Sequence, residues 1–512
     1  MEIPVQYLLP EIILIVAACA ATLMGLSRWD SVRKLTQCVA ATATLLALLV
    51  AYFTGLNYPS DAFAHALYFS PNYITLLACA IGFLTVLASW NMPSQNEPTV
   101  PDYHYRGEFF GMLLFSIAGV AMIGKVNDLL WMFLALELVS IPTYILVATG
   151  RSQIIAQEAG VKYFFLGALA AAIFLFGFSY IYGTTGVTRF AAIHEYFLNH
   201  ELTPLALIGL LAVIIGVCYK IAAVPMHFYT PDVYQGAATP VTAYLAFAPK
   251  AAGMVAIIST LTLINFNWDL RPHIVTPGAM LLDVMTVIAV LTMSVGNVLA
   301  LLQRNIKRIF AYSSIAHSGY MLIGLVAGPN LAHSPSSIDG VDATLFYLAS
   351  YALMNLGALA VLVYLQGKAD AAEDLDDLAG IAKERPGAAL MFAICLFSLI
   401  GMPLTVGFLG KLYIIQAALT TGHPYLAVIV VINAAVAAGY YLRIVAAMYL
   451  RDPLYPFSVR KAFPIRITAI ICSAAVVAFF FAPSFLIRQN LAKSPIPDHP
   501  VITAAATPHG NP

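Results

Sequence analysis

Five ionisable side chains stand inside long apolar segments of this 512-residue chain: Glu137, Lys162, Lys220, Lys250 and Lys411. A charged group at the centre of a lipid bilayer costs roughly 2.5–3.5 kcal/mol or more, so packing alone does not explain all of them. Lysine and glutamate change their protonation when burial or a neighbouring charge changes. These residue types therefore predict proton transfer along a buried series of titratable groups.

A carboxylate and a lysine beside a helix break form the first expected pair. Glu137 lies nine residues after Asp128, where its apolar segment begins, so a rise of about 1.5 Å per residue places it near mid-membrane. Lys220 precedes Pro225 by five residues, and a proline breaks a helix because it lacks a backbone donor. The freed backbone needs protein or a water-filled cavity around it, so the charge of Lys220 can change there. The alternatives are a purely structural ion pair for Glu137 and a lysine that extends to the membrane surface for Lys220.

The second half of the chain shows the same features in reverse order. Lys411 follows Pro403 by eight residues, whereas Lys220 comes before Pro225. Lysines on opposite sides of two helix breaks are the pattern that an inverted repeat produces. Lys250 lies some ten residues into the apolar segment after the first break, with no interface within easy reach.

Two further residues have a second interpretation. Lys162 lies near the start of its segment, four residues after Glu158, and such a spacing also forms an ion pair on a helix surface. His317 stands in the middle of an apolar segment, where a histidine is commonly a hydrogen-bonded core residue. Because the chain has several buried titratable groups, we expect a relay role for His317.

The composition identifies a helical membrane protein. Hydrophobic residues make up 61% of the chain and charged residues 10%, the mean hydropathy is +0.85 and the net charge is zero. The apolar runs are about 20 residues long, which excludes a transmembrane barrel and a soluble enzyme with a single anchor. The six cysteines form no CxxC motif or Cys/His cluster, and no nucleotide-binding loop is present, so we expect no metal or cofactor on this chain.

We expect fourteen membrane spans, of which the seventh and twelfth contain Pro225 and Pro403. The expected spans are 3–26, 35–55, 71–91, 109–124, 128–149, 159–183, 203–236, 240–264, 276–301, 305–327, 342–366, 388–420, 424–447 and 464–487. Residues 190–200 are expected as a short surface helix. If the N-terminus lies outside, most lysines and arginines fall in loops on the inner side, as the positive-inside rule requires. Both termini are therefore expected on the periplasmic side of a bacterial inner membrane.

Three segments resemble one family of membrane proteins. They read PMHFYTPDVYQGAATPVTA at 225–243, QRNIKRIFAYSSIAHSGY at 303–320 and GMPLTVGFLGK at 401–411. These motifs are similar to those of the antiporter-like membrane subunits of respiratory complex I, and the resemblance covers nearly the whole chain. Within that family the chain is most similar to the N-type subunits. One departure is Gln235, where many relatives have a glutamate.

The resemblance implies an all-α fold of fourteen helices with two inverted five-helix repeats, each containing a proline-broken helix. The implied units are helices 1–3 in residues 1–108, the first repeat in 109–264, the second in 276–447, a last helix in 464–487 and a polar tail in 488–512. The residues that match the family's proton relay are Glu137, Lys162, Lys220, Lys250, His317 and Lys411.

The resemblance also implies a function and partners. The chain would move protons while other subunits pass electrons from NADH to quinone through FMN and iron–sulfur clusters. Its neighbours would be the M-, K-, J- and A-type membrane subunits. Two alternatives stay open, namely a subunit of a multi-subunit Na⁺/H⁺ antiporter of the same fold, and a structural membrane subunit that conducts no protons.

Overall fold

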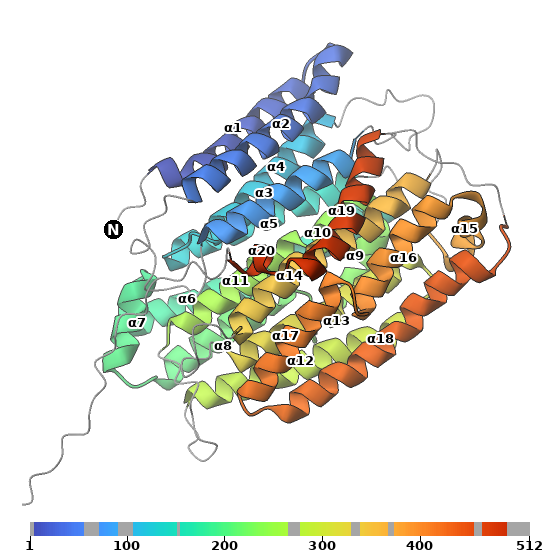
Figure 1. Cartoon of the computed structure of the whole chain (residues 1–512). Helices are drawn as coiled ribbons and strands as arrows, with labels where there is room; N and C mark the ends of the chain where they lie inside the picture. The colour runs from blue at the N-terminus through green and yellow to red at the C-terminus, as the bar shows by residue number, and fades with distance from the viewer. Residues whose placement is uncertain are drawn as a thin grey trace, which may run out of the picture.

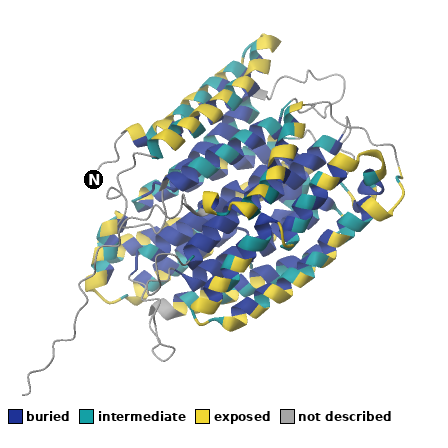
Figure 2. Cartoon of the chain, viewed as in Figure 1, coloured by how far each residue is buried: buried dark blue, intermediate teal, exposed yellow. Residues whose placement is uncertain are grey.

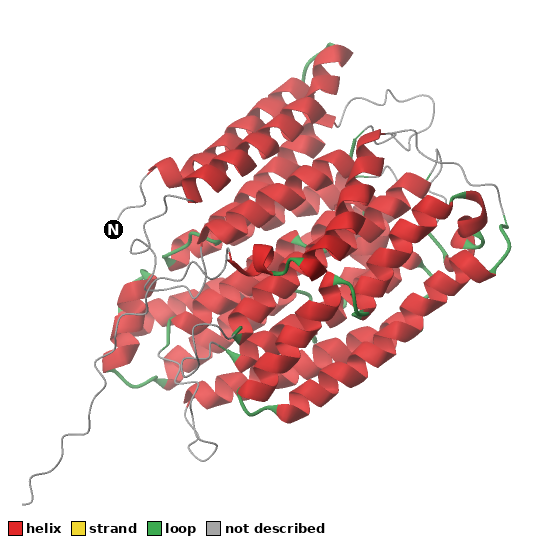
Figure 3. Cartoon of the chain, in the orientation of Figure 1, coloured by secondary structure: helices red, strands yellow, loops and turns green. Residues whose placement is uncertain are grey.

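The computed structural model describes residues 5–55, 71–90, 106–150, 154–264, 277–328, 338–366, 373–454 and 463–488. Within these ranges the chain is helical and contains no strand (Figure 3). The polar tail expected at 488–512 lies outside the described residues, apart from Arg488.

The N-terminal helices form one edge of the bundle (Figure 1). They are α1 (Leu9–Gly25), which follows a 3₁₀ turn at Val5–Leu8, α2 (Asp30–Gly55) and α3 (Pro71–Ala88). Helix α1 packs against α4 (Arg106–Ile123) at a point where Gly25 and Gly107 meet. A Cβ atom on Gly107 would lie 2.3 Å from the Cα atom of Gly25, so only glycine allows this close approach.

The next helices contain the first break. They are α5 (Leu129–Thr149), α6 (Ile154–Thr185), α7 (Phe190–Asn199), α8 (Pro204–Lys220), α9 (Thr230–Gly236), α10 (Thr239–Leu245) and α11 (Ala248–Thr262). The side chain of Asp128 caps α5 by accepting a hydrogen bond from the Leu130 amide at 2.8 Å. Helix α8 ends at Lys220 and α9 begins at Thr230, so the non-helical stretch contains Pro225, as the sequence predicts.

The remaining helices contain the second break. They are α12 (Pro277–Leu301), α13 (Ile306–Ala327), α14 (Gly340–Leu365), α15 (Ile381–Glu384), α16 (Pro386–Ile400), α17 (Val406–Thr420), α18 (Pro424–Leu450), α19 (Phe463–Phe481) and α20 (Ser484–Arg488), with a 3₁₀ turn at Leu375–Leu378. Between α16 and α17, Gly401 and Leu404 have φ angles of +91° and +71°. These left-handed residues stand on either side of Pro403 and end the helical geometry there, which confirms the second predicted break.

Burial divides the helices into a centre and a periphery (Figure 2). Almost every residue of α11, α13 and α14 is buried, whereas α2, α6, α12 and α18 expose large apolar side chains. Exposed apolar faces on long helices are suited to lipid or to neighbouring membrane subunits. The central helices carry Lys250 and His317, so these polar residues lie farthest from lipid.

All fourteen expected spans coincide with a helix or a pair of helices, and residues 190–200 form the expected short helix α7. Ten of the described helices are long and apolar enough to cross a membrane, and five shorter ones are apolar. The eighth expected span is not one helix, because it divides into α10 and α11 at residues 246–247. Pro249 in the first turn of α11 explains the division, because a proline has no amide to hydrogen-bond to the carbonyl four residues earlier, at Leu245.

Candidate functional site

Glu137 on α5 and Lys220 at the end of α8 meet inside the bundle. The Lys220 ammonium lies 3.1 Å from the Glu137 carboxylate and donates a hydrogen bond to the Ser140 hydroxyl at 2.6 Å. The Lys220 side chain is 4% exposed and that of Glu137 is 17% exposed. The ring of Phe174 lies 5.7 Å from the same ammonium. The first pair expected from the sequence is therefore present, directly beside the first helix break.

Hydrogen bonds link the non-helical segment after Lys220 to Lys250 on α11. The Lys250 ammonium donates to the Ser318 hydroxyl at 2.6 Å and also to the carbonyl oxygen of Ser314. The Ser318 hydroxyl donates to the carbonyl oxygen of Ile221 at 2.6 Å, and Ile221 directly follows Lys220. One serine side chain of α13 thus bridges Lys250 and the broken segment.

A small cavity lies between the two lysines. Its lining includes Lys220, Lys250 and the side chains of Tyr163, Tyr229 and Tyr234. The cavity has about 10 Å³ of room for a water centre, which is enough for about one water molecule.

His317 on α13 is buried between tyrosines of two other helices. Its Nδ1 atom lies 2.7 Å from the Tyr347 hydroxyl and its Nε2 atom 3.4 Å from the Tyr441 hydroxyl. The Tyr441 hydroxyl also hydrogen-bonds to Ser313. Both ring nitrogens therefore have a hydroxyl partner, as a relay histidine and a structural core histidine both require.

Lys411 on α17 faces the second break. Its ammonium donates to the carbonyl oxygens of Leu399 and Ile400 at 3.0 and 2.7 Å. These carbonyl groups lie at the end of α16, where the break removes their helical partners. The ammonium also lies 4.9 Å from the ring centre of Tyr320, and that ring packs against His317. Lys411 and His317 therefore contact the same aromatic side chain.

Lys162 lies apart from these residues. Its side chain is 44% exposed and forms ion pairs with Glu158 at 2.8 Å and with Asp232 at 3.1 Å. The ion pair with Glu158 is the surface contact that its spacing also allowed. Asp232 in turn lies 2.9 Å from Arg308, which also donates to the amide oxygen of Gln235 at 3.0 Å.

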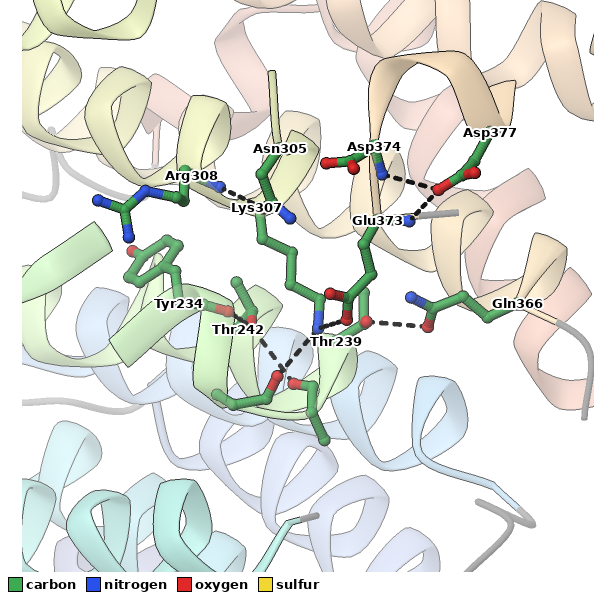
Figure 4. A network of polar contacts seen from close by, with 12 residues as sticks. Tyr234, Thr239, Thr242, Asn305, Lys307, Arg308, Gln366, Glu373, Asp374 and Asp377 are labelled. Atoms are coloured by element: carbon green, nitrogen blue, oxygen red, sulfur yellow. Dashed lines mark hydrogen bonds and ion pairs between the residues drawn. The ribbon is translucent and has the colours of Figure 1, made fainter. Parts of the chain in front are cut away.

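Two lysines outside the expected relay are also buried and paired. The Lys125 ammonium lies 2.5 Å from the Glu11 carboxylate, and both side chains are 3% exposed or less. The Lys307 ammonium is fully buried and lies 3.1 Å from the Glu373 carboxylate (Figure 4). Both lysines stand at helix ends beside polar residues, so no single-sequence pattern separates them from solvated charges.

Metal binding finds no support in this arrangement. Within the described ranges no three His, Cys, Asp or Glu side chains are grouped so as to hold a metal ion. The buried titratable groups contact serine, tyrosine and carbonyl groups instead, which suits the binding and transfer of protons.

The fold and the buried polar series define a multi-pass membrane protein with titratable groups at its centre. Residues 126–437 match the family model described as the NADH:quinone oxidoreductase/Mrp antiporter membrane domain. This chain belongs to that family.

Similar proteins come from several bacteria. The chain is 36% identical over 497 residues to NADH-quinone oxidoreductase subunit N of Rhodospirillum rubrum, a match that covers 94% of each chain. It is 39% identical over 386 residues to the subunit N of Trichlorobacter lovleyi, with 75% of this chain and 76% of the relative covered. A chain of respiratory complex I from Thermus thermophilus has a TM-score of 0.74 and 30% identity, with 94% of this chain and 98% of that chain covered.

Proposed function

We propose that this chain is a proton-translocating membrane subunit of an NADH:quinone oxidoreductase. The observation that carries the proposal is the contact between Lys220 and Glu137 at a helix break, which continues through Ser318 to Lys250. Relatives that align over nearly the full length are named as subunits of that enzyme. Electron transfer from NADH to quinone, with FMN and iron–sulfur clusters, belongs to other subunits.

The relay comprises Glu137, Lys220, Lys250, His317 and Lys411. Glu137 stabilises the protonated form of Lys220, and a change in that carboxylate's charge or distance releases the proton. Lys250 receives it across the small cavity, and His317 and the tyrosines around it extend the path toward Lys411. Lys162 would be the outermost residue of the relay, because its carboxylate partners Glu158 and Asp232 are themselves partly exposed.

Two inverted repeats organise this relay. We assign them to residues 109–264 and 276–447, because each contains one helix broken around a proline, with a buried lysine next to the break. The distribution of lysine and arginine supports an orientation in the inner membrane with both termini on the periplasmic side. The neighbours would be M-, K-, J- and A-type membrane subunits.

The two alternatives make different predictions. A Na⁺/H⁺ antiporter subunit would make proton movement depend on sodium, whereas a purely structural subunit would tolerate neutral replacements of the buried lysines. The complete enzyme with Lys220→Met, reconstituted in liposomes, tests all three. We expect assembly with a lower proton-to-electron ratio or a lower turnover, independent of sodium. Lys383→Met is a matched control because the Lys383 side chain is 57% exposed.

A further inference from the structure

Lys307 and Glu373 form a partly buried ion pair where the two halves of the chain meet (Figure 4). Lys307 lies in the first turn of α13, and its side chain has no exposed surface. Its ammonium lies 3.1 Å from the Glu373 carboxylate and donates to the carbonyl oxygen of Ala237, also at 3.1 Å. Ala237 lies between α9 and α10, so this lysine joins the loop after α14 to the first half of the chain.

The loop that carries Glu373 is held in place by its backbone. The Ile306 amide donates to the Glu373 carbonyl at 2.7 Å, and the Leu375 amide donates to the Arg304 carbonyl at 3.2 Å. The Asp377 carboxylate accepts hydrogen bonds from the amides of Glu373 and Asp374. Glu373 is therefore fixed at the start of α13, and its side chain is 27% exposed.

A separate group of polar contacts lies between this pair and Lys250. Tyr234 on α9 hydrogen-bonds to the Ser314 hydroxyl at 2.8 Å, and Lys250 donates to the Ser314 carbonyl. The Thr242 hydroxyl donates to the Tyr234 carbonyl at 3.0 Å, across the junction of α9 and α10 that Lys307 contacts. Lys307 and Ser314 are two turns apart on one face of α13, which is a rise of about 10 Å.

The exposure of the two partners sets this pair apart from the Glu11–Lys125 pair. Glu11 and Lys125 are both almost fully enclosed, so solvent reaches neither. Glu373 touches solvent whereas its lysine does not, so the pair spans the boundary between bulk water and the interior. A buried ammonium is costly unless it is paired, so loss of the Glu373 charge destabilises the protonated form of Lys307.

We propose that Glu373 and Lys307 form the pair that collects protons from water for a path to Lys250. The pair stands at the outer end of this path, next to the loop between α14 and α16. This inference rests on the proposed function. A proton from water binds a Glu373 carboxylate oxygen and neutralises it. An N–H bond of the Lys307 ammonium then breaks, and its proton moves inward past the hydroxyl groups of Tyr234 and Ser314 to the neutral amine of Lys250, where a new N–H bond forms. The neutral amine takes the proton of Glu373, which restores the ion pair after one proton has crossed the boundary.

Two variants of the complete enzyme test the pair. Glu373→Gln keeps the shape of the side chain but removes the carboxylate that collects the proton. Lys307→Arg keeps the buried charge and the partner but does not release a proton, because arginine stays protonated. We expect both to assemble and to lower proton-coupled quinone reduction in liposomes by about tenfold or more, since proton transfer by a positioned group contributes factors of that size. Glu373→Asp should keep most of the activity.

Asp376→Asn is the matched control. Asp376 lies on the same loop and pairs with Arg451 at 2.7 Å, but both side chains are more than half exposed. The control should pump at the wild-type rate. Wild-type pumping by Lys307→Arg would overturn the inference even if Glu373→Gln failed to assemble. If the wild-type enzyme reduced quinone without moving protons, the proposed function itself would fail, so the two failures are distinguishable.

Discussion

The Glu137 carboxylate on α5 lies 3.1 Å from the Lys220 ammonium, the last residue of α8 before the first helix break. The contact joins residues 83 positions apart in the sequence. The Glu137 carboxylate, whose negative charge is lost on protonation, therefore lies next to a lysine. The chain that follows this lysine is not helical. An ion pair at such a place can switch one proton without moving a whole helix.

Glu137→Ala should impair proton pumping while the enzyme still assembles. Without the carboxylate, the Lys220 ammonium keeps the Ser140 hydroxyl and the Phe174 ring but no negative charge among its described partners, so its protonated form is destabilised. Glu137→Asp should be milder because the charge survives. The measurement is the proton-to-electron ratio in liposomes, and a wild-type ratio for assembled Glu137→Ala would show that the carboxylate has no relay role.

Lys411→Arg should separate a proton carrier from a fixed charge. Arginine can still donate to the carbonyl groups of Leu399 and Ile400, but it does not deprotonate at accessible pH. We expect normal assembly with slower turnover or fewer protons per electron. A wild-type result for Lys411→Arg, together with a strong defect for Lys411→Ala, would mean that Lys411 acts only as a fixed charge.

Lys162→Gln should have a weaker effect than Lys220→Gln. The ion pairs of Lys162 are partly exposed, and such pairs contribute about 1 kcal/mol or less each. We expect most of the coupled turnover to remain. Equal losses in the two variants, measured at equal assembly, would require Lys162 to be as central as Lys220.

Lys125→Met should destabilise the N-terminal helices. The substitution leaves the Glu11 carboxylate buried beside Thr75 without its ammonium, and breaking a buried pair costs about 3–5 kcal/mol. The double variant Lys125→Met/Glu11→Leu should recover most of this loss, because no unpaired charge remains. Thermal release of the subunit from the purified enzyme measures both, and equal stability of the single variant and wild type would contradict the prediction.

The sequence predicts the spans and the two proline breaks because both depend on local properties. Apolar length decides where a helix can cross a membrane, and Pro225 and Pro403 cannot continue one. The short interruption before Pro249 is also local, but it is not among the predicted breaks. Of the predicted relay residues, Glu137 is partly buried and Lys162 is largely exposed. The others, Lys220, Lys250, His317 and Lys411, are buried, and their role in a relay stays a prediction.

Two long-range ion pairs are not predicted from the sequence, unlike the pair of Glu137 and Lys220. Glu11 and Lys125 are 114 residues apart, and Lys307 and Glu373 are 66 residues apart. Hydropathy places Lys125 and Lys307 at the ends of spans and Glu373 in a loop, where a charge is usually solvated. Glu11 lies eight residues into the first expected span. Only the packing of α1 on α4, and of the loop after α14 on α13, turns these charges into buried pairs.

The most direct test of proton transfer through this chain is the proton-to-electron ratio of the complete enzyme with Lys250→Arg. Lys250 connects the pair at the first break to the serines of α13, and arginine keeps its charge but not its ability to release a proton. We predict an assembled enzyme whose ratio or turnover falls well below wild type, whereas the exposed control Lys383→Arg is unchanged. Wild-type values for both Lys250→Arg and Lys250→Met would contradict the account, because they would mean that no proton passes through Lys250.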